Sequence, residues 1–259
     1  MWKDRLNNGL NYSARFTLAD SRTKITRYSN PSGLIDGFYA GKYVGEIWGY
    51  ETIGIAQSDQ EMAEHIGRLI NGGQSNLGQD WKAGDIMYKD LNEDGKIDAG
   101  SHTLQDHGDL KRIGNSTPRY NVGLELAADW KGFDIRMFWQ GTLKRDYFQG
   151  SYYFWGANGR QGPWFSTALK GHDDYFRNDE ASPLGTNLNS YYPRPLFNTD
   201  KNQQSQTKYL QDASYLRLKN LQIGYSLPHN IVQKMGMQHL RIFASGENLF
   251  TITSLIDFF

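Results

Sequence analysis

No cysteine occurs among the 259 residues of the chain, which excludes disulfide bonds, thiolate catalysis and cysteine-based zinc sites. Net charge is also lacking, because 28 lysines and arginines balance 28 aspartates and glutamates. With no basic patch either, nucleic acid is not an expected partner. The sequence contains neither a run of roughly 18 apolar residues, which a spanning helix needs, nor the apolar region of a secretory signal. The chain is therefore expected to be cytosolic or to lack its front part.

The abundant residues favour strands and turns. Aromatic residues make up 14% of the chain, with 16 tyrosines, and there are 28 glycines; aromatic residues are enriched in strands and glycine in turns. Apolar and polar residues alternate with the period of a two-faced strand in the segments 10–19, 120–129, 133–142, 215–226 and 239–250, and a further strand is expected near 43–53. The alternation changes phase near Asn220, which predicts a β-bulge there.

Strand length and connection length distinguish two kinds of antiparallel sheet. The exposed sheet of a soluble sandwich alternates in the same way, but these segments are about 10 to 12 residues long, which is the length that crosses a bilayer at a tilt. Short connections at 130–132 and 228–238 alternate with long ones at 54–118 and 143–212. Outer-membrane barrels have this arrangement of connections.

One helix is expected within 54–118. Ser58 can cap the amide of Glu61 while the Glu61 side chain bonds back to the cap. The helix has an apolar face that ends at a glycine pair, formed by Met62, Ile66, Leu69 and Ile70 before Gly72 and Gly73.

The segment 90–98, DLNEDGKID, resembles the first nine positions of a calcium-binding loop. Such a loop needs side-chain oxygens at positions 1, 3, 5 and 9, a backbone carbonyl at position 7 and glycine at position 6. The residues at the oxygen positions are Asp90, Asn92, Asp94, Lys96 through its carbonyl, and Asp98. Position 12 is Ser101, so we expect Asp106 or Asp109 to supply the last ligand of a structural Ca²⁺. The alternative is a turn whose side chains bond only their own backbone.

Aromatic residues lie among glycine, asparagine and aspartate in the segment 143–212. Ring faces beside polar groups suit the recognition of sugars or peptides, and we predict substrate or partner contact by Trp155, Trp164, Tyr152 and Tyr153. In the alternative, these rings pack into a small core of their own. The acids of 172–180 could serve in glycoside hydrolysis, but any surface loop supplies such pairs, and we predict no catalytic residues.

Five blocks of the sequence follow one another in a family order: KYVGEIWGYETIGIAQSDQE, GDIMYKDLNEDGKID, IGNSTPRYNVGLELAADWKGFDIRMFWQG, YLRLKNLQIGYSLP and LRIFASGENLFTIT. In this order they resemble the C-terminal barrel region of SusC/RagA-type TonB-dependent outer-membrane transporters. The resemblance spans nearly all of residues 1–259. It implies an all-β fold, namely part of an antiparallel transmembrane β-barrel with long extracellular loops and one short loop helix.

The resemblance also implies a function. Such transporters import glycan or peptide fragments through the Gram-negative outer membrane, together with a SusD-like surface lipoprotein and with energy from TonB. The family's signal peptide, TonB box and plug are not in this sequence, so the resemblance implies a fragment that reaches TonB through a missing N-terminal part. The alternatives are a soluble extracellular carbohydrate-binding β-sandwich module and a glycoside-processing enzyme.

The expected topology places the long segments on one side of the membrane. If 10–19 runs towards the periplasm and 43–53 runs back, the later strands alternate so that 54–118 and 143–212 are both extracellular. A calcium ion would then rigidify an exposed loop in a calcium-rich compartment.

Overall fold

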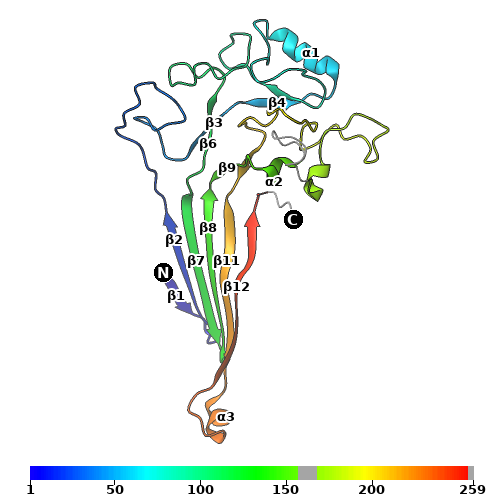
Figure 1. Cartoon of the computed structure of the whole chain (residues 1–259). Coiled ribbons are helices and arrows are strands. Elements are labelled where there is room, and N and C mark those ends of the chain that lie inside the picture. Colours follow the sequence, from blue (N-terminus) through cyan, green and yellow to red (C-terminus); the bar gives the residue numbers. More distant parts are fainter. Residues whose placement is uncertain (157–167, 256–259) are drawn as a thin grey trace. The chain divides into compact units, whose positions relative to one another are not determined.

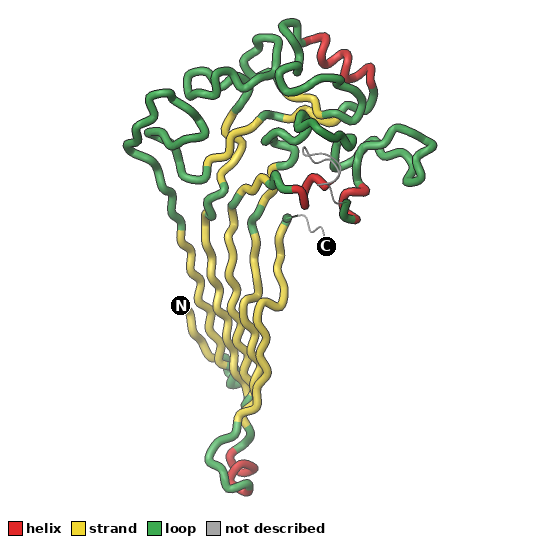
Figure 2. Tube along the Cα trace, viewed as in Figure 1, coloured by secondary structure: helices red, strands yellow, loops and turns green. Residues whose placement is uncertain are grey.

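The computed structural model describes residues 1–156 and 168–255, which divide into two compact units (Figure 1). The sheet unit comprises Met1–Arg22, Thr117–Asp146 and Asp212–Leu255, and the insert unit comprises Thr23–Ser116 and Tyr147–Gln211. Figure 2 shows long strands in the sheet unit and mostly loop in the insert unit. The expectation of a mainly β chain with few helices is confirmed.

The sheet unit is one antiparallel sheet of six strands in the order β1-β2-β7-β8-β11-β12. The strands are β1 (Trp2–Arg5), β2 (Asn11–Ala19), β7 (Arg119–Trp130), β8 (Phe133–Lys144), β11 (Tyr215–Ser226) and β12 (Arg241–Thr253). Five of the six expected strand segments are therefore correct, and β1 takes the place of the sixth. The predicted bulge is also confirmed, because the pairing of β11 with both of its neighbours shifts between Leu218 and Asn220.

The sheet has one apolar and one polar face, as the alternation predicts. In the central register, Leu126 lies opposite Met137 and Leu124 opposite Trp139 on the apolar face. Several apolar-face side chains are more than half exposed, namely Phe16, Leu18, Phe133, Ile223, Ile242 and Ile252. The other sheets of the described residues have two strands each. The described chain is therefore not a two-sheet sandwich.

Long and short connections leave opposite ends of this sheet. β7 and β8 are joined by a two-residue turn in which Lys131 (φ 48°) and Gly132 (φ 90°) both have positive φ, as a type I′ hairpin requires. β11 and β12 are joined at the same end by 227–240, which contains helix α3 (His229–Lys234). At the other end, residues 20–118 join β2 to β7, and residues 145–214 join β8 to β11.

The expected membrane-length strand over 43–53 is wrong. This segment contains two short strands of the insert unit, β3 (Glu46–Gly49), which pairs with β6 (Lys111–Asn115), and β4 (Thr52–Ile55), which pairs with β5 (Ile86–Tyr88). As a result β2 pairs directly with β7 and runs opposite to the expected direction. The end of the sheet from which 54–118 emerges is unchanged, because removing one strand and reversing another restores the same parity.

The insert unit has its own aromatic core, built from both of its segments. Tyr50, Ile86 and Tyr88 from the first segment pack with Phe154 and Tyr209 from the second. The second segment also contains helix α2 (Tyr152–Trp155) and the 3-10 helix η3 (Lys170–Asp173), and the paired strands β9 (Asp146–Phe148) and β10 (Leu210–Asp212) lie at its two ends. The two long connections of the sheet therefore fold as one body.

Helix α1 (Asp59–Arg68) begins where the sequence predicts. The Ser58 side chain accepts a hydrogen bond from the Glu61 amide, but the Glu61 carboxylate accepts from the amide of Gln57 and not from that of Ser58. Met62 and Leu69 are buried as expected, whereas Ile70 is 83% exposed because the helix has already ended. No helix in the described part of the chain is long and apolar enough to cross a membrane.

A buried ion cluster joins the two segments of the insert unit. The Asp85 carboxylate, which is 0% exposed, accepts hydrogen bonds from Arg194 at 2.8 Å and from Lys201 and Asn202 at 2.9 Å each. Burial by itself would raise the pKa of Asp85, but these hydrogen bonds outweigh it and hold the pKa below its ordinary value. The Lys201 ammonium also donates to the carbonyls of Gln79 and Asp80. The carboxylate therefore stays charged although it is buried, and its partners fix the second segment against the first.

Candidate functional site

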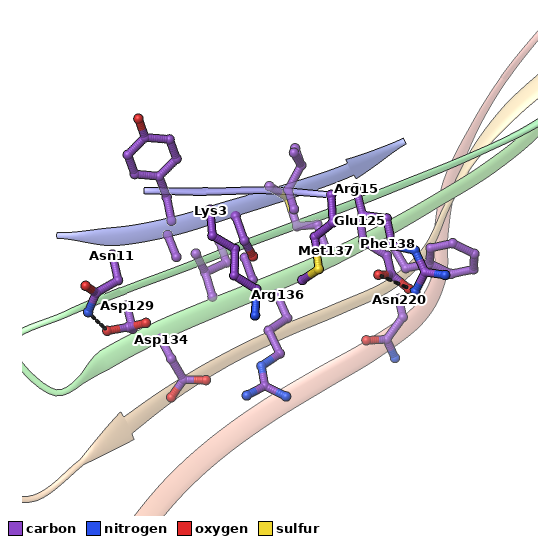
Figure 3. Close-up of a pocket in the computed structure, with 17 residues that line it drawn as sticks. Lys3, Asn11, Arg15, Glu125, Asp129, Asp134, Arg136, Met137, Phe138 and Asn220 are labelled. Carbon is purple, nitrogen blue, oxygen red and sulfur yellow. Dashed lines mark hydrogen bonds and ion pairs between the residues drawn. The ribbon is translucent and has the colours of Figure 1, made fainter. Parts of the chain in front are cut away.

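The polar face of the sheet is hollowed where β1, β2, β7, β8 and β11 come together (Figure 3). The hollow has a volume of about 560 Å³, which is in the range of pockets for small ligands. Its charged lining residues are Lys3, Arg15, Glu125, Asp129, Asp134 and Arg136. They lie on one face because their strands pair in a register that aligns polar positions.

All three acids in the hollow have partners on other strands of the sheet. Asn11 Nδ2 donates to Asp129 at 2.6 Å. The Arg241 guanidinium on β12 donates to both oxygens of Asp134, at 2.9 and 2.5 Å. Arg15 lies 3.7 Å from the carboxylate of Glu125, with both side chains more than half exposed. Asp129 and Glu125 thus link β7 to the adjacent β2, and Asp134 links β8 to β12 across the intervening β11.

Sequence reasoning missed this hollow. Each strand shows its polar positions by alternation, but the positions that meet across five strands depend on register. The signal that could have indicated the hollow is the presence of basic and acidic residues at the polar positions of segments that are expected to pair. Because the arrangement places hydrogen-bonding groups around an open space with no paired nucleophile and base, it suits the binding of a polar solute.

The predicted calcium loop has the expected backbone. Gly95, at position 6, has φ +80°, and a Cβ there would lie 3.1 Å from the Asn71 amide, so the glycine is required. Both oxygens of Asp90 accept backbone hydrogen bonds, from the amides of Glu93 at 2.7 Å and Gly95 at 2.8 Å. Asn92 and Asp94 likewise accept from the amides of Asp94 and Lys96.

Backbone amides also hold the later acids of this loop. Asp109 is buried and accepts from the amides of Leu91 at 2.7 Å and Asp98 at 2.9 Å; burial raises its pKa. Asp106 accepts from the Ser101 amide, and the Lys96 ammonium lies 2.5 Å from Asp98. Across residues 1–156 and 168–255, no three acidic or histidine side chains are grouped to hold a metal ion. These hydrogen bonds form a turn in which the side chains bond the backbone of the same segment.

Calcium binding by 90–98 stays a prediction with a direct measurement. We expect saturable heat when the chain is titrated with millimolar Ca²⁺ in a calorimeter. We expect Asp94→Ala to abolish that heat, because a loop of this type coordinates the ion through position 5. Asp36→Ala, at a side chain that is 81% exposed, is the matched control and should leave the heat unchanged. If the unmodified chain gives no heat, the loop is a turn alone.

The aromatic residues predicted to bind a substrate or partner lie in different surroundings. Trp155 is 2% exposed and makes edge-on contacts with Phe154 and Tyr209 at centroid distances of 4.9 and 4.8 Å. Tyr153, on the same short helix, is 67% exposed. Tyr152 begins α2, and Trp164 lies outside the described residues. The Trp155 ring is thus packed in a core, while Tyr153 is available at the surface.

Comparisons with known proteins connect this arrangement to one group. No protein-family model matches the chain. TonB-dependent receptor P3 of Formosa agariphila is 30% identical over 213 residues, which are 82% of this chain and 18% of that receptor. TonB-dependent receptor P39 of the same organism is 20% identical over 276 residues, covering 96% of this chain and 25% of that receptor. The chain therefore spans about a fifth to a quarter of the length of these relatives.

Solved structures of similar fold belong to a transporter. The RagAB peptide transporter matches with a TM-score of 0.64 at 19% identity, over 98% of this chain and 25% of that chain. The RagAB peptide importer in its open-open state matches with a TM-score of 0.59 at 20% identity, over 99% of this chain and 24% of that chain. The matched proteins are receptors and transporters and not enzymes.

Proposed function

Because the chain belongs to the TonB-dependent receptors, we propose that its six-stranded sheet is part of the wall of an outer-membrane β-barrel that imports nutrient fragments. The observation that carries the proposal is the exposed apolar face of the sheet. Five of its six strands have 9 to 13 residues, β2 and β12 being the extremes, and are long enough to cross a bilayer at a tilt; β1 has only four residues. Lipid would cover the apolar face, and the polar face would line the interior.

The two edges of the sheet support the same proposal. β1 pairs with only Asn11 to Ala14 of β2, and β12 pairs on one side, with β11. Unpaired backbone groups are costly in a bilayer, so spanning sheets close into barrels. Further strands of a longer receptor would satisfy these edges.

The insert unit is proposed to face the outside of the cell. Barrels of this kind have short turns on the periplasmic side and long loops on the extracellular side, and both segments of the insert unit leave the sheet at the end opposite the tight β7–β8 turn. An exposed, folded insert is a surface on which a SusD-like lipoprotein could dock, and Tyr153 is its proposed contact. The fold similarity to RagAB, a peptide transporter, supports a peptide or glycan fragment as substrate. TonB would act through a part of the receptor outside this chain.

A charge placed on the apolar face tests the barrel proposal. We expect Leu124→Arg, in the middle of β7, to destabilise the barrel by about 2–4 kcal/mol, because an arginine at the bilayer midplane loses its hydration. The full-length receptor should then be depleted from the outer membrane. On gels, its unheated sample should no longer differ in mobility from its heated, unfolded sample, as a folded barrel does.

The control is Gln140→Arg, an exposed position on the polar face of β8 that lies opposite Gly123. It adds the same side chain to the interior side and should leave membrane yield and mobility unchanged. Recovery of the unmodified receptor in the soluble fraction without detergent, or equal effects of the two arginines, would instead favour the soluble sugar-binding module.

A further inference from the structure

Two basic residues flank a floor of small side chains in the hollow of the polar face. Lys3 lies opposite Ser13, Ser13 opposite Ala127, and Ala127 opposite Arg136. One row across four strands thus reads basic, small, small, basic. With neighbouring strands about 4.8 Å apart, the backbones of the two basic residues are about 14 Å apart. Ser13 and Ala127 leave the space between them open.

These two cations differ from the acids around them in their bonding. Neither Lys3 nor Arg136 donates a side-chain hydrogen bond to a residue in the part of the chain described. By contrast, Asp129 and Asp134 accept hydrogen bonds, and Glu125 forms an ion pair. The donors of Lys3 and Arg136 therefore remain for a ligand.

The polar face as a whole has more basic than acidic residues. By register, its basic positions are Lys3, Arg5, Arg15, Arg119, Arg136, Lys144, Arg217 and Arg241, and its acidic positions are Glu125, Asp129, Asp134 and Glu247. The apolar face carries Asp4 among its charges, at the edge strand β1. A surface with excess positive charge raises the local concentration of anions.

We propose that the hollow binds a small carboxylate-bearing solute, with Arg136 and Lys3 as its hydrogen-bond donors. Guanidinium groups match carboxylates with two parallel hydrogen bonds, and an ammonium group adds a point charge. The carboxylate belongs to an acidic peptide or to an acidic sugar, because the two share this chemistry. The inference rests on the proposed function, since a closed barrel places this face around its lumen.

Calorimetry on the full-length receptor in detergent tests the proposal with matched probes. The acidic probes are a di-glutamate peptide and a di-galacturonate, and the neutral ones are a di-glutamine peptide and the corresponding neutral disaccharide. We expect at least one acidic probe to bind at least tenfold more tightly than its neutral counterpart, because hydrogen bonds to charged groups are the stronger ones. Which acidic probe binds more tightly identifies the source of the carboxylate.

Substitutions then assign the binding to the hollow. Lys3→Gln with Arg136→Gln should weaken acidic-probe binding at least tenfold and leave neutral-probe binding unchanged. Arg217→Gln removes a charge from the same face outside the hollow, where its Nε already bonds to Thr251, and should change the affinity less than twofold. Equal affinity for acidic and neutral probes, unchanged affinity in the double variant, or no binding of any probe would overturn the proposal. Because membrane insertion is measured separately, such failures leave the barrel proposal standing.

Discussion

Replacing Asp85 with alanine is expected to destabilise the insert unit by about 3–5 kcal/mol, because removing one partner of a buried ion cluster leaves the others uncompensated. Lys201 is 2% exposed and loses its carboxylate, while Asn202 loses an acceptor. Amide hydrogen exchange of peptides that cover β5 should report the loss, since protection there reflects opening of the unit. Exchange in β7 and β8 of the sheet unit should be unaffected.

The matched control for this prediction is Asp36→Ala. Asp36 also pairs with a basic side chain, His102 at 2.9 Å, but it is 81% exposed, and exposed pairs contribute little. Its replacement should change protection of β5 by less than about 0.5 kcal/mol. Similar losses in the two variants would show that the Asp85 cluster does not hold the segments together.

The cluster also predicts how acid acts on the insert unit. The pKa of Asp85 is lowered in the folded protein, so its ionisation favours folding. This contribution is fully present above the ordinary aspartate pKa of about 3.9 and is lost as the pH falls through the lowered value. Protection of β5 should decline over that acidic range in the unmodified chain and show a weaker decline in Asp85→Ala.

Replacing Trp155 with alanine should cost the insert unit about 3–5 kcal/mol, because truncating a fully packed aromatic side chain leaves a cavity. Its ring contacts Phe154, Tyr209 and Tyr192. Limited proteolysis should show faster cleavage within both segments of the unit, since they share this core.

Tyr153→Ala separates packing from recognition. Tyr153 is 67% exposed on the same helix, so its replacement should leave proteolysis unchanged. If this side chain contacts a lipoprotein partner, the variant receptor should recover less of that partner on purification. A variant of Tyr153 that is cleaved as fast as Trp155→Ala would contradict the assignment of their roles, and unchanged partner recovery would remove Tyr153 from the interface.

Strand alternation predicted the sheet because it depends only on which side chains of one strand share a face, and this is the same in the folded sheet. The five long strands and the bulge beside Asn220 were found this way, and the resemblance of the sequence blocks to SusC/RagA-type TonB-dependent receptors is confirmed by the relatives and the fold. The segment 43–53 misled because two short strands, broken at Tyr50, have the length of one long strand. The local pattern of apolar and polar residues does not reveal with which other strand a strand pairs.

The features that sequence could not reveal depend on distant residues. Asp85 and Lys201 are 116 positions apart, and neither has a neighbourhood that marks it as buried. Trp155 and Tyr153 lie in one aromatic run, yet packing separates a core ring from a surface ring. For the loop 90–98 the difficulty is different, because a local pattern that was recognised has two interpretations. Its sequence and its backbone turn suit both a calcium loop and a turn whose side chains bond only their own backbone.

The division of the insert unit into two segments has a consequence for biosynthesis. The first segment ends at Ser116, and its buried Ile86 and Tyr88 await partners as late in the chain as Lys201, Asn202 and Gln206. At about 5–20 residues per second, a growing chain needs roughly 4–20 s to extend from one to the other. During that interval the first segment lacks the hydrogen-bond partners and the rings that the second segment supplies, so its core can be completed only after the second segment has been made.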